Sequence, residues 1–111
     1  MITTHVLDTA AGKAAAGVPI RLERLDAGAW VLVGDGATDA DGRLRTLTPT
    51  GALAEGTYRI QFDTAAYFAA VGVASYFFPV AEIQFLVRDG AAHYHVPLLL
   101  SPFGYSTYRG T

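Results

Sequence analysis

Two histidines near the C-terminus are the strongest candidates in this sequence for proton transfer or metal binding. His93 and His95 stand two positions apart in the run His-Tyr-His-Val-Pro-Leu-Leu-Leu. Successive side chains of a strand point to opposite faces, so a strand here would carry both imidazoles on one face and the core residues Tyr94, Val96, Leu98 and Leu100 on the other. Imidazole changes protonation near neutral pH, so this face could transfer protons or bind a metal ion.

A zinc site on this face would need a third ligand. The remaining histidine, His5, lies on a strand expected over Ile2–Asp8, on the face opposite the core positions Ile2, Thr4 and Val6. The chain has no cysteine, and the histidine face carries no carboxylate, so the residues favour a site without metal. Gly34-x-Gly36 lacks the third glycine of a dinucleotide fingerprint, and Asp39-x-Asp41-Gly42 lacks the closing glutamate of a calcium loop. We therefore expect neither metal nor cofactor.

The end of the chain is expected to fold back beside the histidines. Ser101–Gly104 reads as a reversal, because proline fixes φ and glycine adopts conformations that other residues resist. A second strand from Tyr105 onward would then bring Tyr108, Arg109 and Thr111 near the histidine-bearing strand. On the residues alone, a strand histidine is more often structural than catalytic, so both roles stay open for His5, His93 and His95.

The C-terminal run and two other motifs carry a resemblance. The sequence from His93 to Pro102, the following Phe-Gly-Tyr and the final Tyr-Arg-Gly resemble the signature of the 5-hydroxyisourate hydrolases, the transthyretin-like enzymes of urate breakdown. Thr111 stands where that family ends in serine. Thr4-His5-Val6-Leu7-Asp8 and Asp41-Gly42-Arg43 match as well, so the resemblance extends over the whole chain.

The resemblance implies a function and a site. The activity would be hydrolysis of 5-hydroxyisourate to 2-oxo-4-hydroxy-4-carboxy-5-ureidoimidazoline, without metal or cofactor. The catalytic residues would be His5, Arg43 and His95. Tyr108, Arg109, Gly110 and Thr111 would bind the substrate, whereas His93 is expected to be structural and Arg45 an ordinary surface charge.

The resemblance also implies a fold and an assembly. The fold would be a transthyretin-like antiparallel β-sandwich of two four-stranded sheets with one short helix. The assembly would be a homotetramer, a dimer of dimers, with active sites in a channel between subunits. Two other functions share such a fold: a carrier of small aromatic ligands like transthyretin, and a sandwich domain that mediates protein interactions. Fold by itself does not separate the three.

Composition narrows the class of protein. A chain of 111 residues has room for one core, so residues 1–111 are expected to form a single domain. Apolar residues make up 51% and charged residues 16%, which leaves apolar surface that self-association would cover. A net charge of −2 argues against nucleic acid as a partner. The first residues resemble no signal peptide, so we expect a cytoplasmic protein.

The remaining elements are mostly short strands separated by turn signals. The stretch between Asp63 and Glu82 has no charge, but Gly72, Ser75 and Pro79 interrupt it, so we expect a buried helix over Ala65–Val71 and a strand over Phe77–Val87 rather than a membrane span. Asp89-Gly90 is expected to form a hairpin between that strand and the histidine strand. Further strands are expected at Val18–Leu25, at Trp30–Val33 with Gly34 and Gly36 loosening its end, at Arg43–Arg45 at most, and at Gly56–Phe62.

Overall fold

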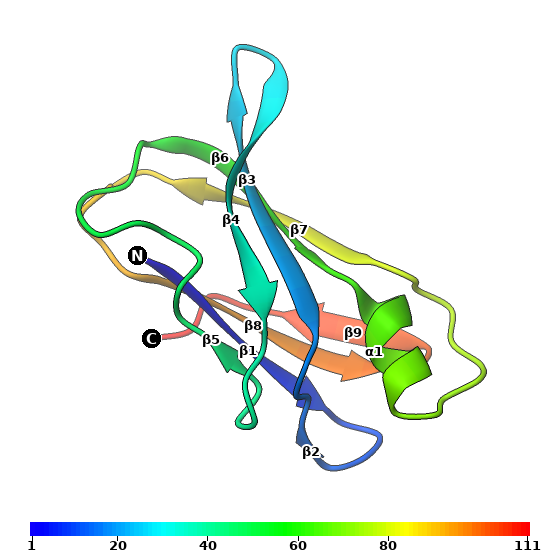
Figure 1. Ribbon diagram of the computed structural model, residues 1–111. Coiled ribbons are helices and arrows are strands. Elements are labelled where there is room, and N and C mark those ends of the chain that lie inside the picture. The colour runs from blue at the N-terminus through cyan, green and yellow to red at the C-terminus, as the bar shows by residue number, and fades with distance from the viewer.

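A computed structural model describes all residues from Met1 to Thr111 and has two sheets packed face to face with one helix at one end (Figure 1). The first sheet contains β1 (Ile2–Asp8), β2 (Lys13–Ala14), β5 (Arg43–Leu44), β8 (Tyr94–Ser101) and β9 (Gly104–Thr107). The second contains β3 (Pro19–Asp26), β4 (Ala29–Ala37), β6 (Gly56–Phe62) and β7 (Ala81–Val87), and the helix is α1 (Thr64–Ala70). The expected β-sandwich with one short helix is confirmed.

The first sheet differs in two respects from the expected four antiparallel strands. It has five segments, because the outer edge of β1 is shared by the two-residue strands β2 and β5. In addition, β1 and β8 are parallel, in a register that runs from Ile2 opposite Tyr94 to Asp8 opposite Leu100. A parallel pair cannot be closed by a tight turn, so the chain between β1 and β8 builds the second sheet before it returns.

The core lies between the sheets and follows the expected alternation. Side chains of β1, β6 and β8 that face inward are fully buried, including Val6, Ile60 and Leu98. Hydroxyl groups inside the core are paired: Thr4 Oγ1 donates to the carbonyl oxygen of Val96 at 2.6 Å. No buried side-chain polar atom lacks a hydrogen-bond partner, which is the condition for burying polar groups at acceptable cost.

The helix forms where expected, but the strand after it begins later than predicted. Asp63 caps α1 by accepting a hydrogen bond from the backbone N–H of Ala66 at 3.0 Å. The predicted start of the next strand at Phe77 is wrong, because β7 begins at Ala81. The carbonyl oxygens of the intervening segment accept hydrogen bonds from the first turn of α1 instead: Thr64 Oγ1 donates to the carbonyl of Phe78, and the Ala65 N–H donates to that of Pro79.

The turn at Asp89-Gly90 does not make the predicted hairpin. It joins β7 to β8, and these strands belong to different sheets: β7 pairs with β6, whereas β8 pairs with β1 and β9. The turn is held by Tyr94, whose hydroxyl donates to the carbonyl of Asp89 at 2.9 Å and accepts from its N–H at 3.1 Å. A turn signal fixes the local reversal but not the partner of the strand that follows.

The glycines of β4 extend that strand rather than loosen it. A Cβ atom at Gly34 would lie 2.0 Å from the carbonyl oxygen of Leu47, and one at Gly36 would lie 3.2 Å from the side chain of Leu44. The missing side chains therefore let the segment after β5 cross close over β4 and bury both leucines in the core. As a result, β4 continues to Ala37.

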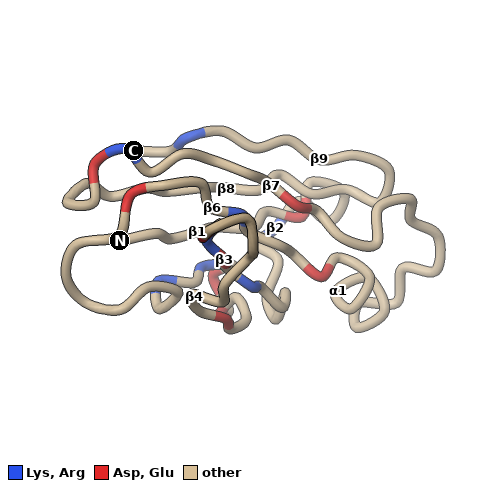
Figure 2. The backbone as a smooth tube through the Cα atoms, turned by 90° about the horizontal axis from the view of Figure 1, so that it is seen from above, with Lys and Arg blue, Asp and Glu red and all other residues tan.

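Basic and acidic residues are interspersed along the chain, with no extended basic run (Figure 2). The uncharged stretch after Asp63 forms α1 and the loop that leads to β7, at the end of the molecule away from the two chain termini (Figures 1 and 2). No helix in the structure combines the length and the hydropathy that crossing a membrane would need.

A tight turn fixes β5 against β1, as the Asp39–Gly42 signal predicts. Gly42 has φ of +76°, accepts a hydrogen bond from the Val6 N–H at 2.7 Å, and a Cβ atom there would lie 2.4 Å from the carbonyl oxygen of Val6. The position therefore needs glycine for its backbone conformation and for its close approach. This turn places Arg43 directly opposite His5.

We predict that Gly42→Ala destabilises the protein by more than about 3 kcal/mol, since it adds a backbone clash to the left-handed strain. Gly12→Ala is the matched control, because Gly12 has φ of +71° but open space where a Cβ would stand; it should cost about 1 kcal/mol. Urea unfolding of the two variants measures the difference. Equal losses would mean that the contact with Val6 does not constrain the turn.

Candidate active site

Three neighbouring strands place the candidate catalytic residues on the outer face of the first sheet. Residues in direct register share a face, and β5, β1 and β8 set Arg43 opposite His5 and His5 opposite Pro97. The adjacent row sets Thr3 opposite His95. His5 and His95 thus lie on adjacent rows of one sheet face, with Arg43 beside His5, and the structure brings the three predicted residues together.

The hydroxyl of Thr3 lies within hydrogen-bonding distance of the His95 ring. Thr3 Oγ1 lies 2.8 Å from Nδ1 of His95 and also 2.8 Å from Nε2 of His93. The Thr3 side chain is buried, with 4% of it exposed, whereas His93 is exposed and precedes β8. One hydroxyl therefore joins the partly buried imidazole of the site to an imidazole at the surface.

The C-terminal segment covers the other side of the His95 ring. β9 pairs with β8, and the same register continues past its end to a bridge in which the Gly110 N–H donates to the carbonyl oxygen of His95 at 2.8 Å. A Cβ atom at Gly110 would lie 2.6 Å from Cδ2 of His95. The predicted return of the chain beside the histidine strand is confirmed, and only glycine allows this approach.

The electrostatic surroundings of His95 favour its neutral form. Burial lowers the pKa of the His95 imidazole, and the positive charges of His93, Arg43, His5 and Arg45 lower it further. These four neighbours are arginines or histidines, which are positively charged when protonated, and no carboxylate offsets their charge. A neutral imidazole beside a permanent guanidinium charge is suited to accept a proton from a nucleophile while a negative charge develops nearby. No group of three histidine, aspartate or glutamate side chains in the fold is arranged to hold a metal ion.

Arg109 lies on the other side of the sheet from His95, which differs from the expectation of a shared binding face. Its guanidinium stacks 4.6 Å from the centre of the Tyr94 ring, and Nη2 donates weakly to the carbonyl of His93 at 3.5 Å. Tyr94 precedes His95 and is a core residue, so strand alternation puts the two side chains on opposite faces. The continued register gives the tail the same alternation: Tyr108 falls opposite Pro97 on the histidine face, and Arg109 falls on the core side.

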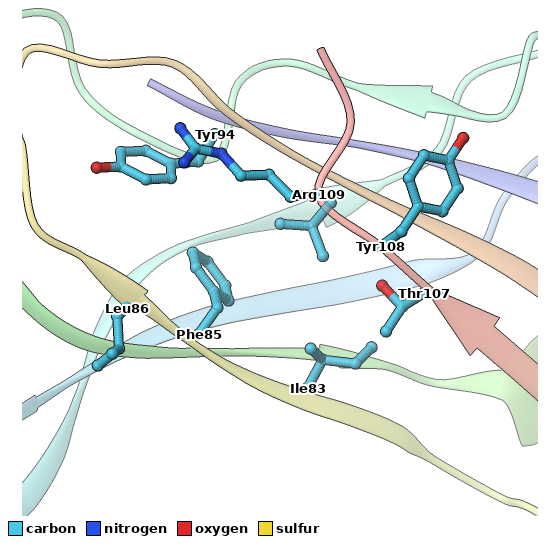
Figure 3. A pocket seen from close by; sticks show the side chains of 8 residues that line it. Ile83, Phe85, Leu86, Tyr94, Thr107, Tyr108 and Arg109 are labelled. Atoms are coloured by element: carbon cyan, nitrogen blue, oxygen red, sulfur yellow. The ribbon is translucent and has the colours of Figure 1, made fainter.

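A pocket of about 220 Å³ lies on that core side, at the open edge between β7 and β9 (Figure 3). Arg109 reaches across it toward Tyr94, while Tyr108 projects the opposite way (Figure 3). The lining is largely apolar and contains no acid or base apart from Arg109 and two tyrosines; it consists of Ile83, Phe85, Leu86, Tyr94, Val96, Thr107, Tyr108 and Arg109. The chemistry-bearing residues are therefore the outer cluster and not this pocket.

Two residues of the cluster were not assigned a chemical role from sequence. Thr3 shares a strand face with His5, but only the parallel register reveals that it faces His95. His93 was assigned a structural role, although its ring shares the Thr3 hydroxyl with His95. The spacing of His93 and His95 is a signal for His93, since residues two apart on a strand share a face.

The fold and the site together define a transthyretin-fold protein with a polar acid–base cluster on one sheet. The chain belongs to the HIUase/Transthyretin family, whose model matches residues 2–110. It is 43% identical to a 5-hydroxyisourate hydrolase of Salmonella typhi over 111 residues, which is 100% of this chain and 81% of that relative.

Solved structures extend the comparison. The structure of Klebsiella pneumoniae 5-hydroxyisourate hydrolase superposes with a TM-score of 0.86 at 35% identity, over 99% of this chain and 97% of that one. Sea bream transthyretin in complex with thyroxine superposes with a TM-score of 0.91, also at 35% identity, over 99% of this chain and 94% of that one. Similarity of fold therefore includes both a hydrolase and a transthyretin in complex with thyroxine.

We predict that the pKa of His95 lies below that of an ordinary histidine and that Arg43→Gln raises it, because the variant removes a positive charge that opposes protonation. Arg24→Gln, on β3 of the other sheet, is the control and should leave the titration of His95 unchanged. NMR titration of the imidazole resonances measures both variants. An unaltered His95 titration in Arg43→Gln would contradict the proximity of these two groups.

Proposed function

We propose that the protein hydrolyses 5-hydroxyisourate to 2-oxo-4-hydroxy-4-carboxy-5-ureidoimidazoline, a step of urate breakdown. The observation that carries the proposal is the gathering of His5, Arg43 and His95 on one sheet face of a chain whose curated relatives are named for this hydrolysis. These three residues are proposed as the catalytic set. Neither a metal nor a cofactor has a part in the proposed chemistry.

The proposed reaction is attack of water on a carbonyl carbon of the six-membered ring. His95 takes a proton from the water as its oxygen bonds to that carbon, a role that its lowered pKa suits because the ring is neutral at neutral pH. The carbonyl oxygen gains negative charge, which the Arg43 guanidinium stabilises. When the ring C–N bond breaks, the leaving nitrogen takes a proton from an imidazole, with His5 as the donor, and the attacked carbon becomes the carboxyl group of the ring-opened product.

The proposed substrate-binding residues are Tyr108, Gly110 and Thr111, with Arg109 as a residue that holds the tail in place. The Gly110 backbone supports this proposal, since it is hydrogen-bonded to His95 and packs on its ring. Tyr108 is 58% exposed and falls on the histidine face, so its ring and hydroxyl are available to a ligand there. The stacking of Arg109 on Tyr94 favours an anchoring role over direct contact with substrate.

The alternative function is a carrier of small aromatic ligands. Because the chain superposes well on sea bream transthyretin, similarity of fold supports a carrier function as well as it supports a hydrolase. The residues favour hydrolysis, because a carrier has no need of a neutral imidazole beside a guanidinium. The curated relatives point the same way, since they are named as hydrolases.

We further propose that residues 1–111 form a single domain and that four copies assemble as a dimer of dimers. A single core cluster supports the first proposal. The second is supported by large apolar side chains left on the surface, among them Phe77 at 70% and Phe103 at 67% exposed, and by a catalytic face that is open on one side of a sheet. A neighbouring subunit would cover that face and exclude water from the site.

The assembly has a direct test. Sedimentation equilibrium at assay concentration should give a mass of about four chains, the value expected for a closed dimer of dimers. A monomer that turns over substrate at full rate would contradict a site completed by a second copy.

Single substitutions test the catalytic set. His5→Ala, Arg43→Ala and His95→Ala should each lower kcat/KM by at least ~100-fold, the usual lower range for losing a general base or an oxyanion partner. Arg88→Ala is the matched control, because Arg88 is an exposed cation outside the cluster and should keep the wild-type rate.

The assay follows the decay of freshly generated 5-hydroxyisourate by absorbance, with circular dichroism to show that each variant is folded. Wild-type protein that gives no rate above the spontaneous decay would overturn the enzymatic function and favour the carrier. Full activity in His95→Ala would instead move the site away from this sheet face.

A further inference from the structure

The His93, Thr3 and His95 side chains form a continuous chain of hydrogen-bonding atoms. Thr3 Oγ1 is 2.8 Å from each imidazole, at Nε2 of His93 on one side and Nδ1 of His95 on the other. The two rings are 6.3 Å apart between their centres, so they do not bond each other directly. Their only polar link is the Thr3 hydroxyl.

The valence of a hydroxyl restricts how the protons are arranged. Thr3 Oγ1 has one proton to donate and lone pairs with which to accept. If it donates to one ring nitrogen, it can accept from the other, and the arrangement is then fully satisfied inside a buried position. In one such arrangement, Nδ1–H of His95 donates to Thr3 and Thr3 donates to Nε2 of His93. That arrangement leaves Nε2 of His95 unprotonated and able to act as a base.

We propose that Thr3 and His93 act with His95 as a proton relay, an inference that rests on the proposed hydrolysis. As Nε2 of His95 takes the proton from water, its Nδ1 proton passes to Thr3 Oγ1, and the hydroxyl proton passes to Nε2 of His93. The Nδ1–H bond of His95 breaks as a new O–H bond forms on Thr3. The original O–H bond of Thr3 breaks as an N–H bond forms at Nε2 of His93. His95 stays neutral, and the positive charge moves to His93.

The charges around the cluster give the relay its advantage. His95 is faced by Arg43 on β5, His5 on β1, and Arg45 beyond β5, with His93 preceding it on its own segment. A positive charge on the partly buried ring of His95 would be opposed by the burial and by each of these groups. His93 is exposed, so water can solvate the charge and carry the proton away. Thr3 and His93 are thus positioning residues that act through His95.

Three single variants test the relay by kinetics. Thr3→Val removes the hydroxyl but keeps the branched shape, and it should lower kcat ~10- to 100-fold with KM changed less than ~3-fold, as for an interaction used only in the transition state. Thr3→Ser restores the hydroxyl and should stay within ~3-fold of wild type. His93→Gln keeps a polar group that cannot carry the charge, and it should lower kcat ~10-fold.

The double variant decides whether the two residues act as one unit. If they do, Thr3→Val combined with His93→Gln should be no slower than the slower single variant, because one break already interrupts the relay. Losses that multiply would mean that the residues act independently. Full activity of Thr3→Val would overturn the proposal, as would a loss in Thr3→Ser equal to that in Thr3→Val.

A second measurement needs no turnover. Nitrogen NMR of the resting protein, at a pH above the titration of His95, should find the proton of His95 on Nδ1, and Thr3→Val should lose this preference. A proton found on Nε2 in the wild type would overturn the relay even if the kinetic losses occur. Because wild-type turnover tests the hydrolysis separately, an active wild type with a fully active Thr3→Val defeats the relay alone, whereas an inactive wild type defeats the proposed function.

Discussion

The parallel pairing of β1 with β8 sets the arrangement of the first sheet and of the residues on its outer face. The two strands come from opposite ends of the chain, and their ladder runs over seven residue pairs from Ile2–Tyr94 to Asp8–Leu100. A shift by one residue would turn His95 into the core and Tyr94 out of it, since side chains alternate along a strand. Burial of Val6 and Leu98 therefore sets the register that also aligns Thr3 with His95.

The ends of β1 are secured by contacts from distant segments. At its C-terminal end, the buried carboxylate of Asp8 accepts a hydrogen bond from the Tyr67 hydroxyl of α1 at 2.6 Å and from two backbone N–H groups of the next turn. At its N-terminal end, the Ile2 N–H donates to Thr48 Oγ1 in the loop after β5 at 3.3 Å. The helix and this loop thus help to hold a strand that carries site residues.

The candidate site concentrates positive charge and offers no carboxylate to neutralise it. Burial lowers the pKa of the His95 imidazole, and the surrounding cations lower it further; the same cations attract negative charge that develops on a bound group. The opposite face of the same sheet is packed with apolar side chains, so any charged partner of the cluster must lie on the outer side of the sheet. The hydroxyl of Thr3 is the neutral group that links the two imidazoles.

The sandwich class, the alternating core and the return of the C-terminal segment could all be predicted from the amino-acid sequence, because they follow from local periodicity and turn chemistry. Its motifs also singled out His5, Arg43 and His95. It did not determine which strands pair: the Asp89-Gly90 turn joins two sheets, β1 and β8 are parallel, and Gly34 and Gly36 continue a strand. The structure was also needed to show that Arg109 lies on the core side of the sheet, where its guanidinium stacks on the Tyr94 ring. The link from Thr3 to His93 and His95 could not be read from the sequence, because it depends on the register of β1 against β8, segments some 90 residues apart in the chain, and local pattern holds no information about register at that range.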